Sequence, residues 1–356
     1  MSWQIKAKPG DFVVREMMRD TERWKDNLQR VRGGRPPKRG SGFLWMTMKK
    51  TDTDFFRALD MIARGLGKGT GDIGYAGTKD RKAVTFQTIS VKGASAEAAS
   101  ALEIPGIGFS GFRGMPRPVR LGDHEGNEFI VTIRNIRAGE SGPLQESLGR
   151  IREKGMLNLF GPQRFGSRGL NGMAGKHLVL GELGEAAACI ARMSGPLHAG
   201  GSGSFEGARG RSKVGGEDAI LRLPARQLKL FIHAFQARIW NRAAAGMAAA
   251  SWRQAAVPIP GYRTKLAGYP EAGPFLEHAL SEEGVSLSDF RSAECPRLSS
   301  KGSERELLCF PRGVSVSIGP DEANPGMMKA TLGFSLGKGS YATELVRQLG
   351  EGGRLI

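Results

Sequence analysis

The sequence predicts an α/β protein with two domains, from its length and from the periodicity of its apolar residues. The chain has 356 residues, about twice the usual size of a single domain. Apolar patterns typical of strands recur at 12–14, 43–48, 83–91 and 129–136 and are mixed with segments of helical spacing. Hydrophobic residues make up 40% of the chain, enough for a buried core, which excludes a wholly disordered protein.

The N-terminal elements follow from local signals. Pro9 and Gly10 predict a turn, and the apolar residues from Phe12 onward predict a strand. The segment 19–42 is polar, rich in Lys and Arg, and interrupted by Gly and Pro, so we expect a basic loop. A second strand is expected at 43–48.

A helix is predicted over 54–64, with Thr51 or Thr53 as its N-cap and Gly65 at its end. Its apolar residues recur at helical spacing and are Phe55, Leu59, Ile62 and Leu66. The strand at 129–136 has two distinct faces. Phe129, Val131 and Ile133 share one face, whereas Thr132 and Arg134 share the other.

The composition changes near residue 155. Residues 155–175 are Gly-rich and irregular, and short apolar helices are expected over 178–193. The segment 195–216 has the composition of a linker or exposed loop, and 225–250 shows a strong amphipathic helical pattern.

The last part of the chain returns to strand patterns. These patterns cover 314–318 and 328–334, and a closing helix is predicted from Tyr341.

A Gly-x-Gly-x-x-Gly match at 106–111 is followed by Arg113 and prolines instead of a helix, so we exclude a dinucleotide site there.

The net charge of +17 predicts a polyanionic partner, and nucleic acid is the commonest polyanion in a cell. A generally basic composition is the alternative explanation.

No apolar stretch approaches the roughly 20 residues that cross a bilayer, and the first residues reach charge and proline too early for a secretory signal. We therefore expect a soluble, cytoplasmic protein. Its three cysteines and five histidines show no CxxC, HxxxH or HxH spacing, so neither a metal site nor a disulfide framework is expected.

The segment most informative for chemistry is 74–87, with the sequence GYAGTKDRKAVTFQ. It places Asp80 in a loop between two strands, beside Lys79, Arg81 and Lys82. Adjacent cations favour an ionised carboxylate, which suits a nucleophile, and they also bind phosphate. A salt-bridged turn with solvated charges is the alternative interpretation.

Five sequence blocks resemble, in order, those of the TruD family of tRNA pseudouridine synthases. The segment around Asp80 resembles the signature of that family. The other blocks are 6–16, 126–129 (GNEF), 158–166 (NLFGPQRFG) and 339–347. Together they extend over nearly the whole chain, so the chain is identified as a member of this family. Leu159 stands where the family usually has Tyr, and Tyr341 stands where many bacterial members have Phe.

The resemblance implies a role for each matching residue. Asp80 is expected to be the catalytic nucleophile and Arg347 its basic partner. The expected uridine-contacting and pocket residues are Phe12, Asn127, Phe129 and Tyr341. The expected RNA-binding cations are Lys6, Lys79, Arg81, Lys82 and Arg164, together with the loop 19–42. Judged from the residues alone, Phe12 and Phe129 would be core residues and Arg347 a cation that compensates a helix dipole.

The resemblance also implies the fold and the reaction. We expect a discontinuous catalytic domain, 1–154 with 309–356, that has a mainly antiparallel mixed sheet, and an inserted α/β domain over 155–308. The enzyme would isomerise uridine, usually uridine 13 of tRNA, to pseudouridine after flipping the base out of its stack. Attack by Asp80 on the sugar and a glycal-type elimination both remain open. No cofactor, metal, membrane or obligate protein partner is expected. The alternatives are the same chemistry on another RNA, or an RNA-binding or folding factor with dispensable catalysis.

Overall fold

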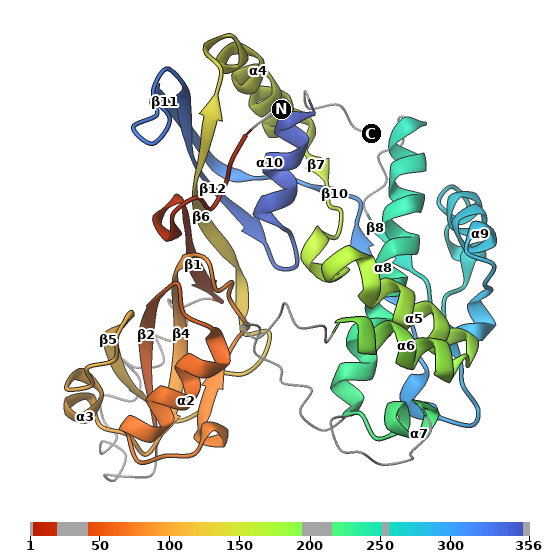
Figure 1. Cartoon of the computed structure of the whole chain (residues 1–356), viewed down its shortest axis with the longest axis horizontal. Helices are drawn as coiled ribbons and strands as arrows, with labels where there is room; N and C mark the ends of the chain where they lie inside the picture. The colour runs from red at the N-terminus through yellow and green to blue at the C-terminus, as the bar shows by residue number, and fades with distance from the viewer. Residues whose placement is uncertain (1–2, 20–41, 194–215, 251–255, 352–356) are drawn as a thin grey trace. The chain divides into compact units, whose positions relative to one another are not determined.

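The computed structural model describes residues 3–19, 42–193, 216–250 and 256–351, which pack as two units (Figure 1). Unit 1 comprises Met1–Arg152 and Pro311–Gly339, and unit 2 comprises Glu153–Phe310 and Ser340–Ile356. The predicted loops at 19–42 and 195–216 lie outside the described residues except at their ends. In the part of the chain that the structure describes, no helix is long and apolar enough to span a membrane.

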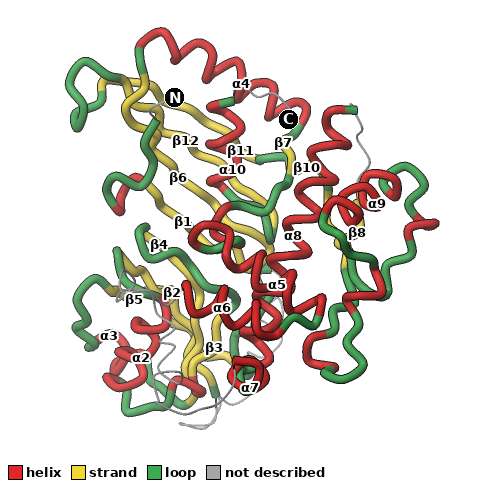
Figure 2. The backbone as a smooth tube through the Cα atoms, turned by 45° about the vertical axis from the view of Figure 1, so that its right-hand side comes forward, coloured by secondary structure: helices red, strands yellow, loops and turns green. Residues whose placement is uncertain are grey.

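Unit 1 is built on one mixed sheet, drawn as continuous yellow strands in Figure 2. Its strands are β1 (Phe12–Met18), β2 (Phe43–Thr51), β3 (Ile73–Tyr75), β4 (Val84–Lys92), β5 (Ile107–Met115), β6 (His124–Ile136), β11 (Arg312–Pro320) and β12 (Met328–Gly337). Their order is β11-β12-β6-β1-β4-β2-β5, and β3 pairs with β4. All these neighbours are antiparallel except β1 and β4, which run parallel. The predicted fold class, with a mainly antiparallel mixed sheet, is confirmed.

Three helices belong wholly or mainly to the first chain segment of unit 1, namely α2 (Phe55–Gly65), α3 (Ala96–Ser100) and α4 (Ser141–Lys154). The predicted helix is α2, and its stripe of Phe55, Leu59 and Ile62 is buried in a core shared with β2 and β4. Its N-cap is Asp54, whose carboxylate accepts the backbone N–H of Arg57 at 3.0 Å. The choice of Thr51 or Thr53 as the cap was therefore wrong.

The two predicted faces of β6 are confirmed up to Ile133, because Phe129, Val131 and Ile133 are buried. Arg134 departs from the pattern, since it is only 5% exposed. It binds Asp11 with three hydrogen bonds of 2.8–3.0 Å and Asp321 with one of 2.7 Å. Two carboxylates distant in sequence thus compensate the cost of burying this guanidinium.

Unit 2 is mainly helical. Its elements are β7 (Met156–Leu157), α5 (Leu170–Leu180), α6 (Leu183–Met193), α7 (Gly216–Leu221), α8 (Ala225–Ala249), β8 (Ala256–Ile259), α9 (Gly273–Glu282), β9 (Ser303–Glu306), β10 (Leu308–Cys309) and α10 (Ala342–Gly350). The predicted long helix is α8, which packs against α5 and α9 around Phe235 and Trp240. A Cβ at Gly175 of α5 would lie 2.0 Å from the carbonyl oxygen of Phe231. Only glycine permits this close approach of α5 and α8.

The closing helix α10 packs with unit 2. The side chain of Gln348 accepts from the backbone N–H of Leu157 at 3.0 Å and donates to its carbonyl at 2.9 Å. The catalytic domain predicted from the sequence, 1–154 with 309–356, includes this segment. A packing unit is not a functional domain, and the predicted domain boundaries stay a prediction.

Candidate active site

The predicted nucleophile, Asp80, lies in the loop between β3 and β4, and its side chain is 31% exposed. Its Oδ2 forms an ion pair of 2.6 Å with Nζ of Lys6, which precedes β1. The same ammonium lies 4.1 Å from the centre of the Phe12 ring. Lys6 has a φ of 57°, a left-handed conformation that is unfavourable for a lysine and that the surrounding structure must maintain. Lys6, which forms the ion pair with Asp80, was predicted to bind RNA and was not predicted to be a partner of the carboxylate.

A second lysine holds the backbone of the same residue. Lys50 of β2 is fully buried, and its Nζ donates to the carbonyl oxygens of Asp80 at 2.5 Å and of Thr53 at 2.9 Å. Burial lowers the pKa of Lys50 to about 8, against the opposing effect of the Asp80 carboxylate. Lys50 was not among the residues predicted for the site. Its position in the strand indicates that it is buried, because it continues the series of alternate residues Leu44, Met46 and Met48, which are all buried.

Lys79 forms an ion pair inside the protein, so its ammonium is not available to a phosphate in this structure. Its side chain is 7% exposed and pairs at 2.5 Å with the fully buried carboxylate of Glu16 on β1. Burial and the charge of Lys79 lower the pKa of His124. Arg81 and Lys82 are exposed, so the predicted contact with RNA stays open for these two residues and has no support for Lys79.

Asn127 lies on the buried side of the sheet, opposite Glu16 of β1. Its Oδ1 is buried and has no hydrogen-bond partner among the described residues, as is also true of Oε1 of Gln87 and Oγ1 of Thr85 on β4. Buried polar atoms normally find partners, so this row is a candidate surface for a polar ligand. At the preceding Gly126, a Cβ would lie 2.2 Å from the carbonyl oxygen of Leu336, which explains the glycine of the GNEF block.

Phe12 and Phe129 are core residues in this structure, with exposed fractions of 3% and 7%. Their rings meet edge to face at 6.1 Å, and Phe129 stacks on Phe334 of β12 at 5.4 Å. This packing matches the interpretation of these residues as core. Their predicted contact with uridine stays a prediction.

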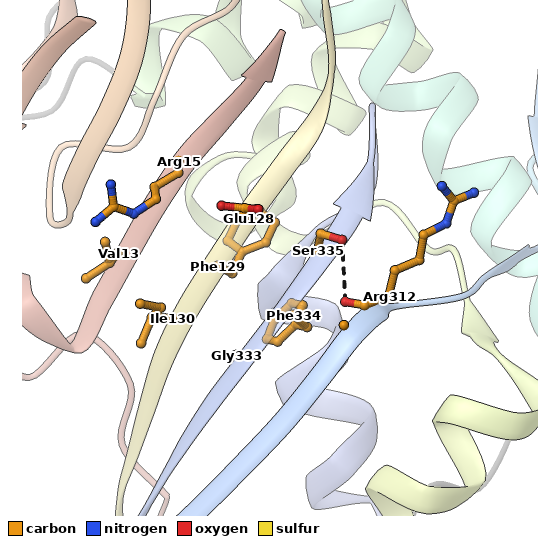
Figure 3. A pocket seen from close by; sticks show the side chains of 10 residues that line it. Val13, Arg15, Glu128, Phe129, Ile130, Arg312, Gly333, Phe334 and Ser335 are labelled. Carbon is orange, nitrogen blue, oxygen red and sulfur yellow. Dashed lines mark hydrogen bonds between the residues drawn. The ribbon is translucent and has the colours of Figure 1, made fainter. Parts of the chain in front are cut away.

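The opposite face of the sheet carries a separate shallow pocket of about 230 Å³ (Figure 3). Its lining includes Arg15 of β1, Glu128 and Ile130 of β6, and Arg312 and Ser335 at the edge formed by β11 and β12. Of the predicted site residues, Phe129 alone is part of this lining, and no residue of the Asp80 loop contributes to it.

In unit 2, Tyr341 is the N-terminal boundary residue of α10. Its ring lies against Gly161 of the NLFGPQRFG block, where an added Cβ would be 3.4 Å from the ring carbons. Arg347, on the same helix, donates from Nε to Glu344 at 2.8 Å and from Nη1 to Glu351 at 2.7 Å. Arg347 therefore has two carboxylate partners close to it in sequence. Its predicted pairing with Asp80, a residue of unit 1, stays a prediction.

The NLFGPQRFG block is itself held by a cation. Arg305 lies 4.0 Å from the ring centre of Phe160 and donates to the carbonyl oxygen of Asn158 at 2.7 Å. Burial lowers the pKa of Arg305 to about 10. Arg164 lies 5.7 Å from the same ring, and together with burial its charge lowers the pKa of His233 to about 4. The predicted contact of Arg164 with RNA stays a prediction.

Comparison with known proteins gives one consistent result. The family model described as tRNA pseudouridine synthase D (TruD) matches residues 1–199 and 245–349. A protein of Methanopyrus kandleri named "Probable tRNA pseudouridine synthase D" is 29% identical over 85% of this chain and 84% of its own length. A protein of Methanosarcina acetivorans with the same name is 28% identical over 97% and 92%. The crystal structure of the putative tRNA pseudouridine synthase D from Methanosarcina mazei is 26% identical, with a TM-score of 0.70, over 97% of this chain and 93% of that one.

Proposed function

The chain belongs to the TruD family of tRNA pseudouridine synthases, and we propose that it modifies uridine 13 of tRNA with the carboxylate of Asp80 as the nucleophile. Pseudouridine synthases are isomerases, and tRNA is the substrate that this family implies. A tRNA substrate is consistent with the net charge of +17 and with a cytoplasmic enzyme.

The observation that supports the role of Asp80 most directly is its pairing with Lys6. The carboxylate is partly exposed, so a flipped-out nucleotide can approach it, while the 2.6 Å ion pair fixes its direction. Lys50 fixes the backbone of the same residue. We assign Lys6 as a basic partner of Asp80.

The reaction requires one bond to break and another to form between the same base and sugar. The bond between N1 of uracil and C1′ of ribose breaks, the base rotates, C5 bonds to C1′, and the proton on C5 is released as N1 gains one. Asp80 either attacks C1′ or removes the proton from C2′, and both routes need its carboxylate beside the sugar. The detached base needs polar partners in the meantime. Asn127, whose buried Oδ1 lacks a partner among the described residues, can accept from N3–H of uracil.

The experiment that tests this function uses an unmodified tRNA transcript and the purified full-length chain. Pseudouridine is located by mass spectrometry, and turnover is followed by tritium release from uridine labelled at C5. Asp80→Asn should abolish release while tRNA affinity changes by less than a few-fold. Asp72→Asn is the matched control, because Asp72 caps its own short turn by accepting from Gly69 N–H at 3.1 Å.

Each outcome has a separate meaning. Substantial turnover by Asp80→Asn would remove the nucleophile assignment. Pseudouridine at a position other than 13 would keep the chemistry and change the substrate. Tight binding of tRNA by the wild-type protein without any pseudouridine would favour an RNA-binding or folding factor.

A further inference from the structure

Unit 2 contains a pocket of about 500 Å³ that the proposed reaction does not use. It is formed by the NLFGPQRFG block, α8 and α10, and it includes Phe160, Phe165, Arg168, Asn241, Glu344 and Arg347. Asn241 is already occupied, since it exchanges two hydrogen bonds of 2.9 Å with the backbone of Phe160. The polar groups left to meet a ligand are therefore a carboxylate and two guanidinium groups.

The carboxylate of Glu344 is the unusual feature of this pocket. Its side chain is only 4% exposed, and Oε2 accepts from Nε of Arg347 at 2.8 Å. Among the described residues, none donates a hydrogen bond to Oε1. Burial raises the pKa of Glu344, while the Arg347 charge opposes the shift. Glu344 thus lines the cavity with a largely buried carboxylate that only accepts hydrogen bonds, and a ligand with N–H groups could donate to its second oxygen.

The charge of the pocket selects the part of an RNA that fits it. A buried carboxylate repels phosphate, so the backbone of the RNA is excluded from contact with Glu344. Aromatic side chains such as Phe165 suit an unstacked base. A single-stranded or flipped base is therefore the chemical class that combines a flat apolar surface with N–H donors.

Among the four bases, guanine matches an ionised carboxylate best. A carboxylate only accepts hydrogen bonds. Guanine presents two adjacent donors on its Watson–Crick edge, N1–H and N2–H, whereas adenine and cytosine place an acceptor beside their amino group. Uracil places its N3–H between two carbonyl oxygens, which would face the carboxylate oxygens. Arg347 also retains Nη2, which no described residue accepts from and which can donate to O6 of guanine.

We propose that Glu344 recognises a guanine of the RNA substrate in this pocket, and that this guanine lies within a few nucleotides of the target uridine. The inference rests on the proposed function, because Tyr341 is expected to contact the target. Tyr341 and Glu344 are three residues apart at the start of α10, about 4.5 Å along a helix axis. The pocket thus adds a sequence preference to the site.

The test replaces individual guanines near the target with inosine, which lacks only the N2 amino group. For the wild-type enzyme, one replacement should lower kcat/KM by about ten- to a hundred-fold, the usual range for a bidentate base contact. Glu344→Gln should lower kcat/KM for the guanine substrate by a similar factor and should no longer distinguish guanine from inosine. Loss of discrimination separates recognition from a merely structural role.

The matched control is Glu351→Gln. Glu351 pairs with the same Arg347 at 2.7 Å, is 35% exposed, and does not line the pocket. This variant should keep the full preference for guanine. If Glu344→Gln does not fold, Glu344→Asp keeps the acceptor and should retain a reduced preference.

The inference fails if the wild-type enzyme accepts every inosine substrate equally well, or if Glu344→Gln still discriminates. The same RNAs are also titrated by fluorescence anisotropy, which does not depend on turnover. If the wild-type protein makes no pseudouridine, the proposed function fails. In that case a guanine preference in binding that Glu344→Gln removes would still support the pocket, and its absence would overturn it.

Discussion

Lys50 offers the sharpest test of how the sheet supports Asp80. We expect Lys50→Met to lower kcat while leaving KM and the fold nearly unchanged. Met has a similar length and no charge, so the substitution removes both hydrogen bonds that Nζ donates, to the carbonyls of Asp80 and Thr53. The loop that carries the nucleophile then loses its attachment to β2.

The magnitude follows from the type of bond. A hydrogen bond from a charged group contributes about 1.5–3 kcal/mol. The hydrogen bond from Lys50 to the Asp80 carbonyl positions the carboxylate of the same residue. Its loss should therefore decrease kcat by about ten- to a hundred-fold. Stability should change much less, because burial disfavours the charged ammonium, as its lowered pKa of about 8 shows. Met relieves that penalty and offsets part of the lost hydrogen bonding.

The assay is single-turnover tritium release at saturating enzyme, together with urea unfolding of each variant. Lys49→Met is the matched control, because the neighbouring Lys49 is exposed and lies 5.9 Å from the ring centre of Phe86. It should keep kcat within about two-fold. A folded Lys50→Met enzyme with wild-type kcat, or an equal loss in Lys49→Met, would refute the positioning role.

Two further predictions concern a buried ion pair and an aromatic ring. Hydrogen bonds from Asn324, backbone N–H groups and Arg134 hold the pKa of Asp321 well below its usual range despite the opposing effect of burial. Its contribution to stability is therefore complete above the pKa of an unfolded Asp and is lost as the pH falls through the lower folded pKa. Asp321→Asn should cost about 3 kcal/mol in urea unfolding at pH 7 and weaken this acid dependence. Glu322→Gln, at a 54% exposed partner of the same arginine, should change little. Tyr341→Phe should retain most activity because it keeps the ring, whereas Tyr341→Ala should lose about ten- to a hundred-fold from stacking. Equal damage by both substitutions would assign a chemical role to the hydroxyl.

The sequence predicted the elements whose burial is regular. β6, β12 and α2 each bury one face or stripe, so their periodicity is visible without a structure. α8 is buried on several sides in its middle, and its length and apolar content made it predictable. β5 was missed because it is Gly-rich, its pairing with β2 contains a register shift, and its exposed residues occur in two adjacent pairs and not in alternation. β8 and β9 were missed because four residues are too few to show a period.

A site residue could be predicted where its own sequence segment indicates its chemistry. It could not be predicted where its role depends on a contact with a residue far away in the sequence. Asp80 could be found from its own segment. Lys6 could not be assigned to it, because 74 residues separate the two and the contact requires an unusual backbone conformation. Lys79 is the converse case, since its proximity in sequence to Asp80 suggested a phosphate contact, whereas in the structure it pairs with Glu16 of β1.

The positive charge of the chain has two separate uses, and only one of them concerns RNA. Several cations are buried or half-buried and bind groups of the protein itself. Lys50 holds the backbone of Asp80, Arg134 holds Asp11 directly before Phe12, and Arg305 holds the backbone of Asn158. Each therefore anchors one of the blocks that resemble the TruD family. Because such internal cations bind groups of the protein, the number of Lys and Arg residues overestimates how many cations can contact RNA. The contribution of an exposed cation should decrease with salt, whereas that of an internal one should not. A salt titration of tRNA binding and of turnover therefore separates the two groups in the same experiment.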